Sequence, residues 1–374
     1  MRVVWALLTH HFWGYRDDGL YDDGIYLDMA RSLLAHGPLA PTHPPGYALF
    51  LAPFLSLGGS LGVSLARWVQ LGLSALTAVL GYRLAVQLRL SRAAALGAGA
   101  ALALDPMLIY FSSRMMSETL FVVLVSAFLL VWINAWRSGR ARDAALAGLL
   151  GGAATLTRGV ILPFGGVLAM VALWRRREQP RWAALVAVCG LCWAAALAPW
   201  TARNWREYGR FVPVSVQGGW NFYEGLTVDP AQVRHARAEA MGEEAHRLGF
   251  DDPFSSDAYF GAKARAWVRA HPGEFLRLCA IKAARFWRPA PEPPHGTAVR
   301  LAAGTFYLAL FALALLGLRP ALRAPGAWFL IAWIAHLNVL HAVFASDLRY
   351  RLPLAPALAV LAGAGLAALR GRDR

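Results

Sequence analysis

The sequence predicts an all-α polytopic membrane protein. Of its 374 residues, 57% are apolar and 16% are charged, which is too apolar for an ordinary soluble domain. Apolar runs of about 17–25 residues, the length that a helix needs to cross a bilayer, recur along the chain. Arginine-rich segments follow every second run, as in a chain that crosses a membrane repeatedly.

The apolar runs give the expected membrane segments in order. Residues 1–12 are apolar but short, so we interpret them either as a first helix clipped by a misassigned start or as a helix along the interface; no cleavable signal peptide is evident. The run 143–174 is interrupted by Thr157-Arg158-Gly159, which predicts two short helices that meet at a turn. With these, we expect about ten membrane segments, the full spans being 64–82, 93–111, 118–136, 182–200, 300–318, 327–345 and 353–369.

The charges predict the orientation. Arginines cluster near positions 83–92, 137–142, 175–181, 319–323 and 370–374, and the positive-inside rule assigns all five clusters to the cytoplasm. Only three of the 22 acids, Asp143, Glu178 and Asp373, belong to these segments. We therefore expect a protein of the bacterial inner membrane whose polar site faces the periplasm or the cell exterior.

A long polar segment divides the chain. It contains helix-like stretches at about 230–247 and 256–270, a third that starts at Pro272, and a Pro-rich return to the membrane at 289–296. We expect an N-terminal catalytic module, 1–200, with a first outer loop at 13–46; an extracytoplasmic helical loop, 201–299; and C-terminal membrane helices, 300–374.

The first outer loop holds a repeated acidic unit, Asp17-Asp18-Gly19-Leu20-Tyr21 followed by Asp22-Asp23-Gly24-Ile25-Tyr26. Uncompensated carboxylates beside a hydrophobic span are costly, so their presence here indicates a functional site. The helical stripe that follows leaves a second interpretation open, in which the acids only cap a surface helix.

Three arginines on the same side indicate an anionic ligand. Arg158 lies in a turn between apolar helices, and Arg349 and Arg351 flank Tyr350. A guanidinium group binds phosphate through two parallel hydrogen bonds, although each arginine could instead extend to lipid headgroups. Glu118, at the outer start of a helix, is interpreted either as a capping residue or as a site residue.

The sequence gives less support to a redox site, a zinc site or nucleic-acid binding. Cys189 and Cys192 have a CxxC spacing but lie within an apolar run, so we interpret them as small buried hydrophobic residues. The histidines lack the i, i+4 spacing of a helical zinc pair, and no basic patch interleaved with aromatics suggests nucleic acid.

Several motifs together carry a family resemblance. The stretch DDGIYLDMARSLLAHG followed by HPPGYALFLAPF resembles the first outer loop of GT-C glycosyltransferases, in the group of dolichyl-phosphate-mannose protein mannosyltransferases and of aminoarabinose and galacturonic acid transferases. Further similar motifs follow in family order: residues 106–121, Leu156-Thr157-Arg158, residues 200–209, Gly218-Gly219-x-Asn221 and Arg349-Tyr350-Arg351-x-Pro353.

The resemblance implies an inverting glycosyltransferase with a GT-C bundle. It would move a hexose or pentose from a polyprenyl phosphate to a lipid, glycan or protein acceptor on the outer face of the membrane. Asp22 would be the general base, and Asp23 and Glu118 would position the acceptor or a divalent cation, Mg²⁺ or Mn²⁺. Arg158 with Arg349 or Arg351 would hold the donor phosphate. The substrate cavity would be lined by Tyr26, His43, Arg203, Asn221 and Tyr350.

Two departures and one rival function remain open at this point. The second acid of the pair is usually Glu in this group but is Asp23 here, and Asp17-Asp18 offers a rival register for the base. The rival function is a non-enzymatic transporter or flippase of lipid-linked sugars, for which the polar candidates at one face and the lack of an internal repeat give little support.

Overall fold

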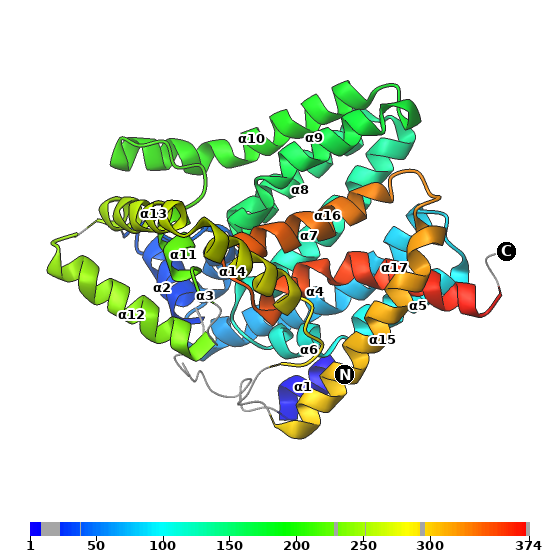
Figure 1. The fold of residues 1–374 in the computed structure, drawn as a ribbon, viewed down its shortest axis with the longest axis horizontal. Helices are drawn as coiled ribbons and strands as arrows, with labels where there is room; N and C mark the ends of the chain where they lie inside the picture. Colours follow the sequence, from blue (N-terminus) through cyan, green and yellow to red (C-terminus); the bar gives the residue numbers. More distant parts are fainter. Residues whose placement is uncertain (9–22, 38, 228–230, 251, 292–295, 372–374) are drawn as a thin grey trace.

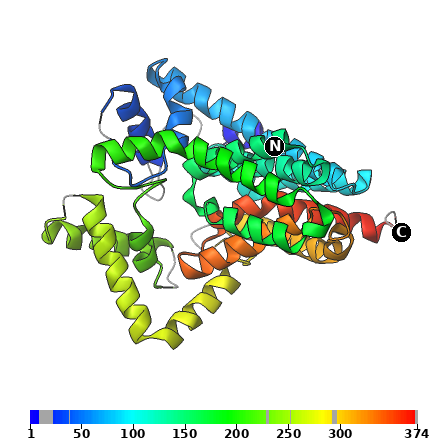
Figure 2. The same cartoon turned by 90° about the horizontal axis from the view of Figure 1, so that it is seen from above.

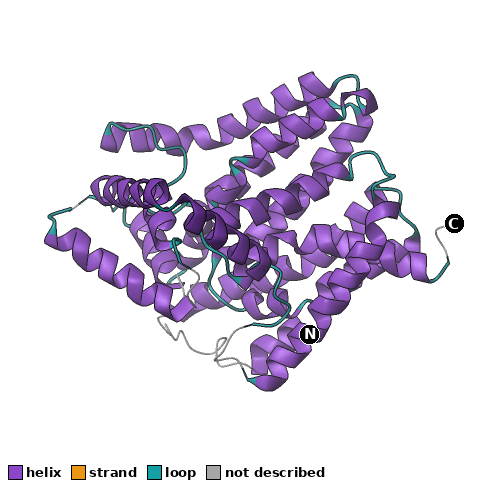
Figure 3. Cartoon of the chain, in the orientation of Figure 1, coloured by secondary structure: helices purple, strands orange, loops and turns teal. Residues whose placement is uncertain are grey.

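The computed structural model describes residues 1–8, 23–37, 39–227, 231–250, 252–291 and 296–371. Within these ranges the chain consists of helices and loops, with no strand (Figure 3). The prediction of an all-α membrane protein is confirmed at this level, because several helices are long and apolar enough to cross a bilayer.

The number of candidate spans is smaller than expected. In the described ranges, five segments have the length and composition of a span, and a bent pair would make six. The five are α4 (Gly59–Gln87), α7 (Ser117–Ser138), α10 (Trp182–Tyr208), α15 (Thr297–Ala321) and the stretch Leu348–Leu369, which consists of the 3₁₀ helix η3 (Leu348–Leu354) and α17 (Ala355–Leu369). Three more apolar helical segments are shorter: α3 (Gly46–Leu55), Gly159–Trp174 and α16 (Trp328–Val343).

The expected span 93–111 is broken at Asp105. Its halves are α5 (Arg92–Leu104) and α6 (Pro106–Ser112), which are bent by 49°. The Asp105 carboxylate accepts hydrogen bonds from the backbone N–H groups of Met107 and Leu108, at 2.9 and 3.0 Å, and so caps α6. Proline at the first helical position has no N–H to donate, which favours a new helix start here.

The run 143–174 contains the predicted turn. Helix α8 (Ala141–Thr157) ends at Arg158, whose backbone is extended, and the 3₁₀ helix η1 (Gly159–Ile161) leads into α9 (Phe164–Trp174). The prediction of two short helices that meet at 157–159 is therefore confirmed.

The arginine-rich turns gather at one end of the bundle. The turn after α7 contacts the turn before α10, because the Gln179 side chain donates to the Trp136 carbonyl at 2.6 Å and the Trp136 indole donates to Glu178 at 3.2 Å. The helices of the long loop lie at the other end (Figure 1). This arrangement separates the basic turns from the polar site.

The long loop forms a helical unit beside the bundle (Figure 2). The three predicted helices are present as α12 (Ala231–Arg247), α13 (Pro253–Ala270) and α14 (Pro272–Arg285), preceded by α11 (Gly218–Glu224). Asp252 caps α13 through hydrogen bonds from Phe254 and Ser255 at 2.8 and 3.0 Å. Helix α10 runs past residue 200, the expected module boundary, and ends at Tyr208.

The first outer loop packs on the bundle through α2 (Asp23–Leu34) and α3. The ring of Tyr26 lies 5.1 Å from that of Tyr47, edge to face, and both side chains are buried. The Leu39 carbonyl accepts hydrogen bonds from Arg203 and Tyr208, each at 2.8 Å, which fastens this loop to α10. The N-terminal turn of α2 is thereby held near α7 and α8. Helix α1 (Arg2–Leu8) lies beside α6.

Candidate functional site

A cavity of about 1370 Å³ lies between the bundle and the helical loop. One part of its wall is apolar and comes from α1, α6 and the start of α15, with Val4, Trp5, Met107, Tyr110, Val299 and Ala303. The other part is polar and carries arginines from several elements: Arg158, Arg285, Arg288 and Arg349. A ligand with an apolar tail and an anionic head matches this division.

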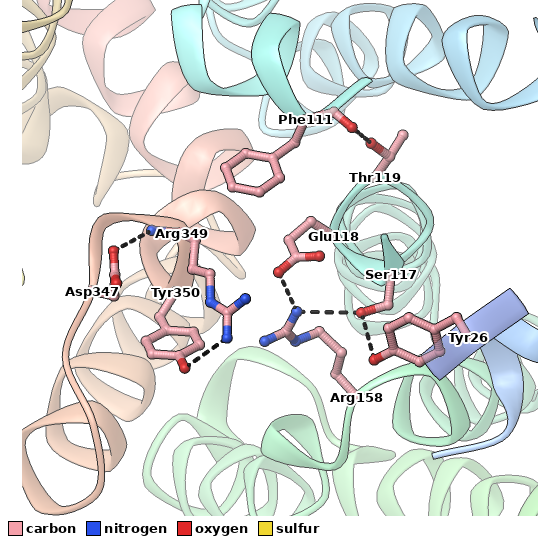
Figure 4. Close-up of polar contacts among 9 residues, drawn as sticks. All are labelled: Tyr26, Phe111, Ser117, Glu118, Thr119, Arg158, Asp347, Arg349 and Tyr350. Carbon is pink, nitrogen blue, oxygen red and sulfur yellow. Dashed lines mark hydrogen bonds and ion pairs between the residues drawn. The ribbon is translucent and has the colours of Figure 1, made fainter. Parts of the chain in front are cut away.

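Arg158 is the centre of the polar wall (Figure 4). Its Nη1 donates to Glu118 Oε1 at 2.7 Å and to Ser117 Oγ at 3.3 Å. The Tyr26 hydroxyl donates to the same Ser117 oxygen at 3.2 Å. The guanidinium carbon also lies 5.8 Å from the centre of the Tyr350 ring. Three elements therefore position one cation: α7, η3 and, through Ser117, α2.

Glu118 occupies the first turn of α7, where the helix dipole favours a carboxylate. The side chain is buried, with 2% of the residue exposed. Its Oε1 is bonded to Arg158, whereas Oε2 has no hydrogen-bond partner among the described residues. A buried carboxylate with one unused oxygen is costly in isolation, so the pairing with Arg158 is what makes this position tolerable.

A second arginine reaches the cavity from η3. Asp347 begins this 3₁₀ helix and accepts a hydrogen bond from the Arg349 backbone N–H at 3.4 Å. The Arg349 side chain donates to the Tyr350 hydroxyl at 3.1 Å. Tyr350 in turn stacks on His341, with ring centres 4.7 Å apart and planes within 4°. The ring of Tyr350 thus lies between an imidazole and two guanidinium groups.

Two of the predicted site residues serve other contacts. Arg351 is buried outside the main cavity, donates to the carbonyls of Phe286 and Arg288 at 3.0 and 2.7 Å, and packs on the Tyr307 ring. Arg203 donates to the Leu39 carbonyl and pairs with Glu207, and it does not line the cavity. These geometries favour a role in holding loops for both arginines.

The remaining predicted residues divide into two groups. Tyr26, His43, Asn221 and Tyr350 line the cavity with Arg158 and Arg349. Asp22 lies outside the described residues, as does the first copy, Asp17-Asp18, and for Asp23 only the backbone at the start of α2 is described. The general base and its neighbour therefore stay predictions.

The cavity includes polar residues that the sequence reasoning missed. They are Glu224, Arg285, Arg288 and His341, and the buried Ser117 behind the wall joins Tyr26 to Arg158. Arg285 is the last residue of α14 and Arg288 lies beyond its end, so helical spacing in the sequence could not place both on one face. No sequence signal separates His341 from the other histidines, because its place depends on the packing of α16.

No group of three or more His, Cys, Asp or Glu side chains among the described residues could hold a metal ion. Cys189, Cys192 and Cys279 are free thiols, and Cys189 is buried.

Part of the chain matches a known protein family. Residues 42–200 match the family model described as dolichyl-phosphate-mannose-protein mannosyltransferase. No curated protein matches the chain significantly by sequence.

Solved structures of archaeal oligosaccharyltransferase share the fold. The archaeal oligosaccharyltransferase AglB from Archaeoglobus fulgidus, solved with an inhibitory peptide and a dolichol-phosphate, has a TM-score of 0.62 at 13% identity, over 99% of this chain and 50% of AglB. An oligosaccharyltransferase structure from the same organism, with Zn and sulfate, has a TM-score of 0.59 at 11% identity, over 98% of this chain and 48% of that one. ArnT from Cupriavidus metallidurans, bound to undecaprenyl phosphate, has a TM-score of 0.44 at 18% identity, over 98% of this chain and 77% of ArnT. The chain thus spans about half the length of the archaeal enzymes.

Proposed function

From the membership of residues 42–200 in the dolichyl-phosphate-mannose-protein mannosyltransferase family, we propose that the chain is a membrane glycosyltransferase that takes its sugar from a polyprenyl-phosphate donor. The observation that carries this proposal is the cavity with an apolar wall and an arginine-bearing wall. The dolichol-phosphate bound to AglB, which shares the fold, is a ligand of the same chemical class.

The donor would lie with its polyprenyl chain along α1, α6 and α15 and its phosphate at Arg158 and Arg349. Burial of the chain against apolar side chains supplies affinity, and the two guanidinium groups neutralise the phosphate. As the bond from the anomeric carbon to the phosphate oxygen breaks, negative charge grows on the leaving phosphate. Fixed cations at that position stabilise the charge without rearrangement.

An acceptor hydroxyl would attack the anomeric carbon from the face opposite the phosphate, with inversion. Its proton would pass to Asp22, which immediately precedes α2. Tyr26, one turn into that helix, bonds to Ser117 beside Arg158, which supports a base close to the phosphate site. Asp23 and Glu118 would orient the acceptor.

A divalent cation, Mg²⁺ or Mn²⁺, would need ligands besides Glu118, because no group of three or more His, Cys, Asp or Glu side chains among the described residues could hold one. Oε2 of Glu118 is a buried carboxylate oxygen with no hydrogen-bond partner among the described residues, and carboxylate oxygens suit such hard cations. When bound, the cation would offset charge on the donor phosphate. The protein's own arginines already perform that task at the geometry described.

The proposal also includes the membrane arrangement. The arginine-rich turns would lie in the cytoplasm and the cavity would face the periplasm or cell exterior, as the positive-inside rule predicts. The three shorter apolar segments would also lie within the bilayer, which brings the count towards the expected ten. The acceptor would be a lipid, glycan or protein of the cell envelope.

The test is transfer by purified protein in lipid vesicles with labelled polyprenyl-phosphate sugars. We expect Asp22→Asn to lose about a hundredfold or more of the transfer rate, as for removal of a general base, while it still binds the donor. Asp17→Asn, at the same place in the first copy, is the matched control and should retain activity. Loss in Asp17→Asn alone would move the base to the first copy. Movement of the labelled lipid across the vesicle without transfer would establish the transporter instead.

A further inference from the structure

Lys282 is buried at the junction between the helical loop and the bundle, with 2% of the residue exposed. Its ammonium group donates to three backbone carbonyls: Gly225 at 3.0 Å, Val343 at 2.8 Å and Phe344 at 2.9 Å. Gly225 follows the last residue of α11, and Val343 is the last residue of α16. One cation therefore lies at the C-terminal ends of two helices, where unpaired carbonyls and the helix dipoles favour positive charge.

The geometry suits lysine in particular. Only Lys263 and Lys282 are lysines among the 37 basic residues of the chain, so arginine is its usual cation. An ammonium group has three rotatable N–H donors on a compact centre, whereas a guanidinium group is planar and larger. Three carbonyls around one buried nitrogen match the geometry of the ammonium group. A methyl group on Gly225 would overlap the Phe344 carbonyl, so the two backbones leave little room at this junction.

The junction fixes the arm 344–350, every residue of which lines the cavity. The arm starts at Phe344, a partner of Lys282, and ends at Tyr350. Ser346 Oγ donates to the Lys282 carbonyl at 3.0 Å, which is a second link between the arm and α14. A third link joins α16 to the arm, where Nδ1 of His341 is 2.8 Å from the Ala345 carbonyl. The position of Arg349 follows from these contacts.

We propose that Lys282 is a positioning residue for donor binding: it couples α11 and α14 of the helical loop to the arm 344–350 and so holds Arg349 and Tyr350 at the phosphate site. The donor part of this inference rests on the proposed function. The structural part, that Lys282 orders the arm, stands on the contacts alone. Loss of the ammonium group would leave three buried carbonyls without this partner, and the arm would open more often.

The experiment compares Lys282→Met with the wild-type protein in vesicles. We expect amide hydrogen exchange in 344–350 to quicken about tenfold, because local opening becomes easier. The KM for the polyprenyl-phosphate donor should rise about tenfold, with a smaller change in kcat. Lys282→Arg should restore only part of either value, because the guanidinium group does not fit the three carbonyls.

Lys263→Met is the matched control, since Lys263 pairs with Glu244 within the helical loop, between α13 and α12. It should leave exchange in 344–350 and the donor KM unchanged. Wild-type exchange of the arm in Lys282→Met would overturn the proposal, as would a reduced kcat with an unchanged donor KM, which indicates a merely structural role. If Lys282→Met cannot be purified, Ser346→Ala decides the same question by the same two measurements. A wild-type enzyme without transfer activity would refute the proposed function, and the exchange measurement would still decide the role of Lys282.

Discussion

At the scale of single residues, the pair Glu118 and Arg158 determines the character of the site. Each is expensive to bury alone, and together they leave the arginine fixed towards the cavity with one carboxylate oxygen unused. Such a pair adds little net stability, but removal of one partner leaves an uncompensated charge. The site and the local stability are therefore linked through the same two side chains.

We predict that Glu118→Gln lowers the free energy of unfolding by about 2 kcal/mol, because Arg158 loses its charged partner in a largely buried position. The transfer rate should fall about a hundredfold, since Arg158 is no longer held at the phosphate site. Thermal unfolding in detergent and a transfer assay measure the two effects. Asp28→Asn is the control, because Asp28 and Arg31 form an exposed pair that should contribute at most about 0.5 kcal/mol. Equal effects of the two substitutions would contradict the assignment.

Substitutions of Arg349 and Arg351 should affect different properties, the donor KM and the stability respectively. Arg349→Met is expected to raise the donor KM about tenfold or more with little loss of stability, because Arg349 lines the cavity. Arg351→Met should lower the free energy of unfolding by about 1–3 kcal/mol, because two buried carbonyls lose their donor. The donor KM and the unfolding midpoint of each variant test this division. A reversed pattern would place Arg351 at the donor.

The sequence could predict arginines at the cavity but could not tell which of them line it. Both Arg349 and Arg351 flank Tyr350, and a one-dimensional pattern is the same for each. What distinguishes them is that η3 turns Arg349 to the cavity and Arg351 to the carbonyls after α14. His341 and Lys282 were missed for the same reason, since their contacts join segments far apart in the chain.

At the scale of elements, the apolar runs predicted the helices well, because hydrophobic length is the main requirement of a membrane helix. The turn at Arg158 and the helices of the long loop were also predicted, from breaks in the apolar pattern and from prolines. The bend at Asp105 was not predicted, although Asp-Pro is a helix start signal. Apolar residues continue on both sides of it, and this hides the break.

The contact between α15 and α17 depends on glycine. A methyl group on Gly317 would overlap the Leu361 carbonyl, so the helices approach backbone to backbone. We predict that Gly317→Ala lowers the free energy of unfolding by about 1–3 kcal/mol, as for overpacking. Gly72→Ala in α4 is the matched control, since nothing lies within 4 Å of the added methyl group, and it should be neutral or stabilising. Unfolding midpoints in detergent compare the two, and a neutral Gly317→Ala would refute the close approach.

The helical loop contains an ion pair that should respond to pH. Lys263 Nζ lies 2.8 Å from Glu244 Oε1, and this hydrogen bond is the largest cause of the lowered pKa of Glu244. A folded-state pKa below the unfolded value means that the pair stabilises the loop fully above about pH 4.3, and that this contribution is lost as pH falls through the folded pKa. Glu244→Gln should therefore quicken amide exchange in α12 and α13 at pH 7, and by less at pH 3. A difference of the same size at both pH values would show that the carboxylate charge is irrelevant.

At the scale of the whole molecule, the distribution of basic residues is consistent with the position of the cavity. The basic turns lie at one end of the bundle, and α2, α3 and the helices of the long loop lie towards the other (Figure 1). Lipid-linked substrates require an opening that an apolar chain can enter beside a polar chamber that an acceptor can enter. The cavity lies where the bundle meets the helical loop, which satisfies both requirements in one place.

This arrangement predicts the topology. A reporter that is active only in the cytoplasm should work when fused after Ser138, because the turn there is arginine-rich and the positive-inside rule retains it. A reporter that is active only outside should work when fused after Leu248, at the end of α12 and beyond α10. Paired fusions at the two sites, each with both reporters, give four readings that must agree. If Ser138 reads outside and Leu248 reads cytoplasmic, the cavity faces the cytoplasm, and the donor would then have to present its sugar on that face.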